Sequence, residues 1–220
     1  MIFEDEPVPG YPLPILPGHT SPGRLERVLR AGAFARRWAL PGGRVRPDET
    51  LDEAARRELA AQTGVRDVYL EQLYTFGSPH RDPQGRVVSV AYVALIPHAG
   101  RFQGPRGSDK YADVAWVPVA RRPRLAYDHP AVVKTALARL RGKLEYTNLA
   151  YTLLPRAFTL GDLQQLYEAI LGRRLDRRNF RKKILSLGLL RGLGRLRRGR
   201  HRPAALYAFR HRRPMLISLL

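Results

Sequence analysis

Gly43-Arg-Val-Arg-Pro-Asp-Glu49 and, after seven intervening residues, Arg57-Glu-Leu-Ala-Ala-Gln-Thr-Gly-Val65 are the stretches that decide the fold. Apolar residues recur at helical spacing from Leu51 to Leu59, and Gly64 is the residue type that commonly ends a helix. We therefore predict a glycine-rich loop followed by a helix over Leu51–Thr63. The loop carries an acidic residue, and the helix carries an adjacent arginine and glutamate.

Strand and helix patterns surround this loop and helix. We predict strands over residues 67–74, 87–96 and 111–119, and an amphipathic helix over Pro130–Leu140. Residues 7–23 contain six prolines and three glycines, which favours an extended or turning segment over a paired strand. The mixture predicts an α+β domain around one core, which we assign to residues 1–143.

The pattern changes at residue 144. Apolar residues at helical spacing predict a first helix over Tyr146–Leu154, a capping box at Thr159 starts a second, and Asp176 can cap a third. Residues 189–192 and 204–209 then read as a hairpin around a basic loop, residues 195–202. Three short helices followed by a hairpin indicate a winged helix-turn-helix domain, which we assign to residues 144–220.

Positive charge is concentrated at the end of the chain. The formal net charge is +20, and residues 171–220 hold sixteen Lys or Arg and one acidic residue, against 23 and 18 in the first 170 residues. Such asymmetry predicts a polyanionic partner, with nucleic acid ahead of an anionic membrane because the basic stretch lacks a long amphipathic apolar face. The third helix of a winged helix enters the major groove and the wing contacts phosphates or the minor groove. The candidate DNA-binding residues are Arg177, Arg178, Asn179, Arg181 and Lys182 on the helix, and Arg195, Arg197, Arg198, Arg200 and Arg202 on the wing.

The composition points to the cytoplasm. The chain has no cysteine, so disulfides and thiolate metal sites are excluded. Its first 17 residues lack the pattern of a signal peptide, and no apolar run approaches the roughly 18 residues of a membrane helix. We therefore expect a cytoplasmic protein that associates with the nucleoid when it is bound to DNA.

The loop and helix resemble a Nudix box, the motif of hydrolases that cleave nucleoside diphosphate derivatives. Gly43, Glu49, Arg57, Glu58, Leu59, Gly64 and Val65 stand in register with that motif, and Ala61 and Gln62 stand where the family has paired glutamates. These hydrolases need Mg²⁺ to neutralise charge and activate water, and Mg²⁺ prefers carboxylate oxygens. We therefore predict that catalysis is lost, that no metal site remains, and that the pocket binds its ligand without cleaving it.

A Nudix-like domain before a winged helix resembles the bacterial Nudix-related transcriptional regulators of NAD metabolism. The resemblance covers roughly residues 35–210 and implies a Nudix-type α/β/α sandwich in a homodimeric repressor of NAD biosynthesis or salvage genes. It also implies that ADP-ribose, with no further cofactor, releases the repressor from its operator. Members usually begin with two strands, the second near residues 27–29, whereas the proline-rich segment here displaces the first. The candidate effector-binding residues are Arg37, Arg44, Arg57 and Arg81.

Other functions remain open at this stage. An active Nudix hydrolase on ADP-ribose or a related nucleoside diphosphate derivative would need a substitute glutamate, for which Glu71 is a candidate. An RNA-binding or ribosome-associated protein would use the same positive charge without a sequence code. NAD, a phosphorylated intermediate or a sugar are alternative effectors, and Arg57 and Glu58 could serve only to hold the loop on the helix.

Overall fold

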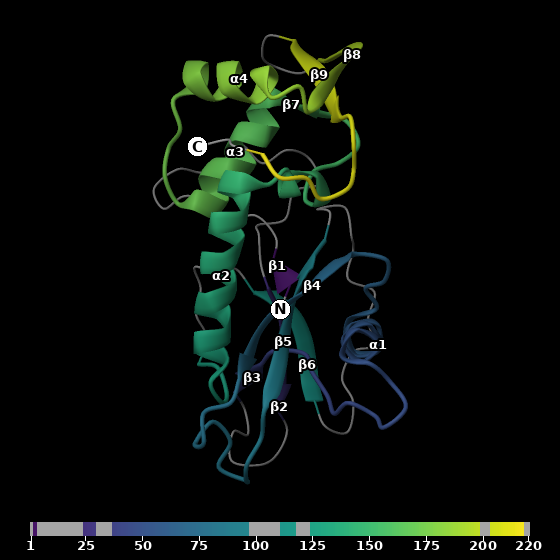
Figure 1. The fold of residues 1–220 in the computed structure, drawn as a ribbon, viewed down its shortest axis with the longest axis vertical. Coiled ribbons are helices and arrows are strands. Elements are labelled where there is room, and N and C mark those ends of the chain that lie inside the picture. Colours follow the sequence, from purple (N-terminus) through teal and green to yellow (C-terminus); the bar gives the residue numbers. More distant parts are fainter. Residues whose placement is uncertain are drawn as a thin grey trace. The chain divides into compact units, whose positions relative to one another are not determined.

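The computed structural model describes residues 2–3, 24–29, 37–96, 111–117, 124–198 and 203–217. It divides into two compact units, and the division falls between Ala138 and Arg139, inside helix α2 (His129–Tyr146). Helix α2 is unbroken across this point (Figure 1). The sequence-based domain boundary after residue 143 stays a prediction.

Two three-stranded sheets form the first unit. In one, β5 (Ser89–Leu95) lies between β1 (Ile2–Phe3), which is parallel to it, and β4 (Tyr69–Phe76), which is antiparallel. In the other, β2 (Arg24–Leu29) pairs antiparallel with both β3 (Trp38–Ala39) and β6 (Tyr111–Val117). The two-residue β1 precedes the proline-rich segment, so a first strand does form. Residues 7–23, for which we predict extended chain, lie outside the described residues.

Helix α1 (Leu51–Thr63) begins and ends as the sequence predicts. Thr50 and Glu53 form a reciprocal capping box, and Gly64 ends the helix in the left-handed conformation with φ 72°. Leu59 is buried against Ala94 of β5, and Val65, Val68 and Leu70 pack around this cluster. The apolar face of α1 thus fixes the helix against the chain that follows it, and its polar residues face the loop before it.

Among the described residues, the second unit contains the last turns of α2, a short 3₁₀ helix, two further α-helices and a three-stranded sheet. Helices α3 (Leu160–Leu171) and α4 (Arg177–Ser186) follow η1 (Leu149–Thr152). The sheet has β9 (Ala204–Phe209) between β7 (Phe158–Thr159) and the wing strand β8 (Leu190–Arg197) (Figure 1). Its core contains apolar side chains of both α-helices, with these fully buried: Leu163, Leu166, Tyr167 and Ile184.

Three sequence-based element bounds were wrong by more than two residues. Helix α2 continues to Tyr146 instead of ending at Leu140. The helix predicted over residues 146–154 is reduced to η1, because two side chains at its start make other contacts: the Thr147 hydroxyl accepts from the nearby Leu149 amide, and Asn148 pairs with the distant Met215. Strand β8 extends through Arg197, so Arg195 and Arg197 lie on a strand and not in the wing loop.

Among the helices within the described residues, none combines the length and apolar character needed to cross a membrane.

Candidate functional site

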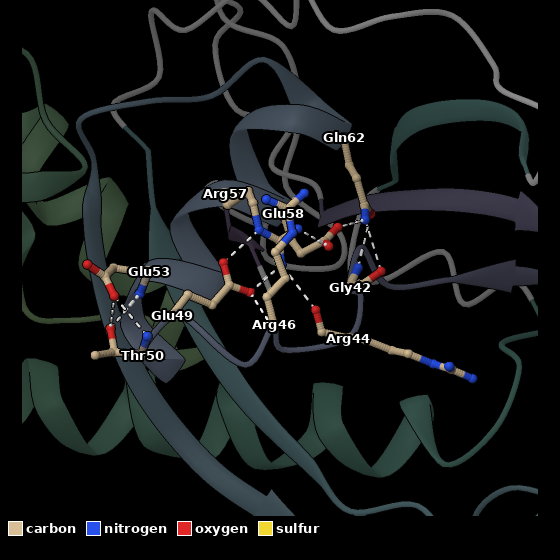
Figure 2. A network of polar contacts seen from close by, with 9 residues as sticks. All are labelled: Gly42, Arg44, Arg46, Glu49, Thr50, Glu53, Arg57, Glu58 and Gln62. Atoms are coloured by element: carbon tan, nitrogen blue, oxygen red, sulfur yellow. Dashed lines mark hydrogen bonds and ion pairs between the residues drawn. The ribbon is translucent and has the colours of Figure 1, made fainter.

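The guanidinium of Arg57 joins the loop of residues 43–49 to helix α1 (Figure 2). Its Nε and Nη2 donate to the two carboxylate oxygens of Glu49, at 2.8 Å and 2.5 Å. Nη1 donates to Glu58 at 2.5 Å, and Nη2 also donates to the carbonyl of Arg44 at 3.0 Å. One cation therefore forms ion pairs with both of the glutamates that the motif retains.

Electrostatics follow from this geometry. Hydrogen bonds from Arg57, assisted by one from the Arg46 amide, lower the pKa of Glu49 to about 2. The same contacts, led by that to Glu49, raise the pKa of Arg57. Glu49 and Arg57 consequently stay ionised at any physiological pH. We therefore expect the ion pair between them to persist across that pH range.

Gln62 closes the other side of the network with an amide where the motif has a carboxylate. Its Oε1 accepts from the Gly42 amide at 3.0 Å, and its Nε2 donates to the Gly42 carbonyl at 2.9 Å and to Glu58. The side chain is 8% exposed, so these contacts form largely away from water. A carboxylate could make only the first of the three, because it has no N–H to donate.

Glu58 approaches the loop closely at position 43. A Cβ on Gly43 would overlap the carboxylate of Glu58. A larger residue here would therefore displace the end of the Glu58 side chain from its contacts with Arg57 and Gln62.

The residues of this site do not fit a magnesium ion. Ala61 is exposed and has no donor oxygen, and the Gln62 amide nitrogen occupies the position between the Glu58 carboxylate and the Gly42 carbonyl. Within the described part of the chain, no cluster of three or more His, Asp or Glu side chains could hold a metal. Glu71, the candidate substitute, accepts from the hydroxyl of Tyr69 instead.

The four arginines predicted to bind the effector are in different situations. Arg44 and Arg57 lie together, but the Arg44 side chain extends away from the network, and its guanidinium forms no hydrogen bond to the described residues (Figure 2). Arg37 is exposed, immediately before β3. Arg81 is 9% exposed and donates to both oxygens of Asp128, at 2.9 Å and 2.7 Å. Arg44 and Arg37 are therefore the more exposed of the four side chains.

Two contacts at the start of α2 were missed by the sequence analysis. One is the ion pair of Arg81 with Asp128, and the other is the hydrogen bond from the Leu40 amide to Nδ1 of His129, at 3.0 Å. The partners are 47 and 89 residues apart in the chain, respectively. Only their place in the fold reveals them, since neither pair forms a local motif.

Helix α4 presents a basic surface. Phe180 and Ile184 are buried beneath it, and Asp176 caps it by accepting from the Asn179 amide at 2.7 Å. Arg181 is partly covered, and its Nε is buried without a hydrogen-bond partner among the described residues. The predicted DNA-binding residues that lie exposed on this helix are Arg177, Arg178, Asn179 and Lys182.

The basic residues of the wing divide by their contacts. Arg195, Arg197 and Arg198 are all exposed, but Arg197 also makes a two-point ion pair with Asp162 at 2.9 Å and 2.8 Å and donates to the Thr159 hydroxyl. Asp162 and Thr159 form the capping box of α3, so Arg197 ties β8 to the start of that helix. Arg200 and Arg202 lie outside the described residues.

Comparison with known proteins assigns both halves of the chain. Residues 25–136 match the NUDIX domain family, and residues 150–209 match the NrtR DNA-binding winged helix domain. The ADPR-responsive transcriptional repressor NtrR of Acinetobacter baylyi is 38% identical over 174 residues, which are 78% of this chain and 69% of the relative. The chain belongs to the NrtR family.

Solved NrtR structures support the same assignment over nearly the full length. The crystal structure of Shewanella oneidensis NrtR matches with a TM-score of 0.77 and 32% identity, covering 95% of this chain and 91% of that one. Its complex with a 27mer DNA matches with a TM-score of 0.74 and 30% identity, over 95% and 90%. The NUDIX domain of that protein, crystallised with ADP ribose, matches with a TM-score of 0.50 and 30% identity, over 63% and 83%.

These matches confirm the predicted fold class. The chain combines a Nudix-type α+β domain with a C-terminal winged helix. The resemblance noted in the sequence, to Nudix-related transcriptional regulators, is likewise confirmed.

The contacts in the wing of this NrtR-type domain predict that Arg195 and Arg197 contribute differently to DNA binding. Replacing Arg195 with glutamine should reduce the slope of log affinity for duplex DNA against log salt by about 0.9, the contribution of one neutralised phosphate. Replacing Arg197 with glutamine should leave that slope within about 0.3, because its charge is already paired with Asp162. The half-exposed pair should contribute no more than about 1 kcal/mol to the free energy of unfolding. Fluorescence anisotropy at several salt concentrations measures both slopes, and equal reductions would show that Arg197 leaves Asp162 for the DNA.

Proposed function

We propose that this protein is a transcriptional repressor that binds operator DNA through its winged helix and is released by ADP-ribose bound to its Nudix-type domain. The observation that carries the proposal is the combination of a degenerate Nudix motif, whose loop is held by the Gln62 amide, with a basic winged helix on the same chain. The degenerate motif can bind a nucleotide ligand without a metal. The winged helix can bind DNA and so convert ligand binding into a change in transcription.

Duplex DNA is the nucleic acid that the second unit suits best. Arg and Asn are the side chains that address guanine and adenine in the major groove, and α4 exposes both types on one short helix. The relative crystallised with a 27mer DNA aligns over nearly the whole chain. We propose that two copies bind a two-fold operator, because the symmetry of a dimer is matched by repeated half-sites.

ADP-ribose is the effector best supported for the first unit. A relative is named for its response to ADP-ribose, and the NUDIX domain of another was crystallised with it. We place the ligand phosphates near the glycine-rich loop, with Arg44 and Arg37 as their contacts. Arg57 and Arg81 would then hold the surrounding loops through their ion pairs.

Binding without cleavage follows from the side chains present. Hydrolysis of a diphosphate by this kind of site depends on Mg²⁺, and Ala61 and Gln62 leave the retained glutamates paired with Arg57 and an amide. We infer that the protein is a regulator in the cytoplasm and not an enzyme. Genes of NAD biosynthesis or salvage are the regulon that the family resemblance implies.

The test is a titration of labelled duplex DNA from the protein's own upstream region. At physiological salt the protein should favour this duplex over random duplex or RNA by at least about 1000-fold. Saturating ADP-ribose should weaken binding roughly 150-fold, equivalent to a coupling free energy of about 3 kcal/mol. Equal affinity for RNA would contradict the proposal, as would rapid release of products from ADP-ribose with Mg²⁺.

A further inference from the structure

The segment that leads into α2 is tied to β3 by backbone hydrogen bonds. The amide of Ala126 donates to the carbonyl of Trp38 at 2.8 Å, and the amide of Trp38 donates to the carbonyl of Arg124 at 3.4 Å. Ala126 is completely buried, in a cluster with Ala39 and Tyr127. The chain therefore enters α2 from a fixed position beside β3.

One hydrogen bond connects the first residue of α2 directly with the loop at the degenerate motif. The amide of Leu40 donates to Nδ1 of His129, and two residues later Gly42 makes both of its backbone contacts with the Gln62 side chain. Residues 38–42 are thus held at one end by α2 and at the other by α1. A displacement of this loop necessarily strains one of the two attachments.

A second attachment lies beside the first. Asp128, the residue before His129, accepts both hydrogen bonds of the Arg81 fork, and Arg81 belongs to the loop between β4 and β5. Removing an acceptor from a buried arginine is costly, so this pair holds the start of α2 firmly to that loop. Asp128 and His129, at the start of α2, therefore contact two separate loops of the Nudix-type unit.

The backbone is strained at the junction. Tyr127 has a φ of 53°, a left-handed conformation that is unfavourable for an aromatic residue and costs on the order of 1–3 kcal/mol. Such a conformation persists only when the surrounding contacts impose it. Here the contacts are those of Ala126, Asp128 and His129 on either side, so loosening any of them allows the start of α2 to change direction.

We propose that His129 is a positioning residue that transmits a displacement of residues 38–42, which comprise β3 and the chain that leads into the glycine-rich loop, to helix α2. This inference rests on the proposed function, since it requires an effector at the glycine-rich loop and DNA at the winged helix. Helix α2 runs unbroken across the division between the two units. A change in the direction of its first turn, at His129, therefore also changes the position of its last turns. Effector binding that moves Leu40 changes the hydrogen bond to Nδ1 and with it the direction of α2.

Two substitutions separate this role from simple stabilisation. His129→Phe keeps an aromatic ring beside Tyr127, whose ring centroid is 5.4 Å away, but removes the acceptor for the Leu40 amide. His129→Asn removes the ring but retains an acceptor, because Oδ1 of asparagine extends about as far as Nδ1 of histidine. If the ring matters the asparagine variant fails, and if the hydrogen bond matters the phenylalanine variant fails.

The experiment measures three constants for the full-length protein and each variant. They are the affinity for ADP-ribose alone, the affinity for operator DNA alone, and the affinity for DNA at saturating ADP-ribose. For His129→Phe we expect the first two within about threefold of wild type and the response to ADP-ribose reduced from roughly 150-fold to less than about 5-fold. For His129→Asn most of the response should remain. If the phenylalanine variant does not fold, His129→Leu provides the same loss of acceptor.

The outcomes are distinct. A full response in His129→Phe would overturn the inference, and so would an equal loss of response in both variants. Loss of either separate affinity together with the response would assign His129 a structural role and also overturn it. A wild-type protein that binds neither DNA nor ADP-ribose would instead contradict the proposed function.

Discussion

Replacing Arg178 and Lys182 together with alanine is expected to lower the affinity for operator DNA by about 10²- to 10³-fold. The two side chains lie four residues apart on one exposed face of α4, opposite the buried Phe180 and Ile184. A contact to a base or phosphate contributes about 1–3 kcal/mol, and tenfold in affinity corresponds to about 1.4 kcal/mol. The measurement is fluorescence anisotropy with labelled operator at fixed salt, accompanied by a thermal unfolding curve.

A matched control removes the same charge elsewhere. Arg56 and Arg66 are exposed residues of the Nudix-type unit, and their double alanine variant should bind DNA within about threefold of wild type. Both double variants should unfold near the wild-type temperature, since the four side chains are exposed. Equal losses in the two variants would mean that net charge, and not the α4 surface, determines binding.

Local signals in the sequence predicted much of the secondary structure. Helix α1 has a capping threonine, a regular apolar stripe and a terminal glycine, and its bounds were predicted correctly. The capping box of α3, the capping aspartate of α4 and the apolar faces of both helices worked in the same way, because each signal is complete within about a dozen residues. Helices and strands whose ends are set by nearby residues can be predicted from a single sequence.

Tertiary partners limited the prediction elsewhere. Residues 146–154 have helical apolar spacing, but Asn148 is buried and bonds to Met215 and the carbonyl of Arg213, 67 and 65 residues away. Those contacts override the local preference for a helix. The end of α2 was misplaced for a related reason, since its last turns belong to the second unit and not to the first.

The motif predicted which side chains lie together at the candidate site, and which of them bind the effector stays a prediction. The motif correctly brought Glu49, Arg57 and Glu58 together, and the alternative that Arg57 holds the loop on the helix describes the contacts seen. Arg81 and Arg197 were selected for their charge, which says nothing of a partner 47 or 35 residues distant. Positive charge in a sequence predicts a basic surface. Which of its arginines and lysines can contact a ligand depends on whether acidic residues lie beside them in the fold.

Gln62 provides the prediction with the largest effect on the first unit. Replacing Gln62 with glutamate should lower the free energy of unfolding by about 2 kcal/mol without Mg²⁺. The change removes the donor to the Gly42 carbonyl and places a second carboxylate against Glu58, and an unsatisfied buried polar group costs about 1–3 kcal/mol. Denaturant unfolding in a chelating buffer measures the loss.

The pH dependence of this variant has a definite sign. Burial and the neighbouring Glu58 should raise the pKa of the introduced carboxyl in the folded state above its unfolded value of about 4.3. The folded state then binds more protons than the unfolded state, so the free energy of unfolding of the variant falls as the pH rises through that interval. The variant should therefore approach wild type near pH 4 and differ most near pH 8. Gln62→Met, which removes the amide without adding charge, should lose a similar amount at every pH.

Magnesium should reverse the defect once both glutamates of the Nudix motif are present. With glutamate at both 61 and 62, millimolar Mg²⁺ should raise the unfolding temperature, because a cation that binds only the folded state stabilises it by mass action. The wild-type protein should show no such rise, since an amide nitrogen stands between the Glu58 carboxylate and the Gly42 carbonyl. A wild-type protein stabilised by micromolar Mg²⁺, or a Gln62→Glu variant as stable as wild type at pH 8, would contradict the view that this amide has replaced the metal.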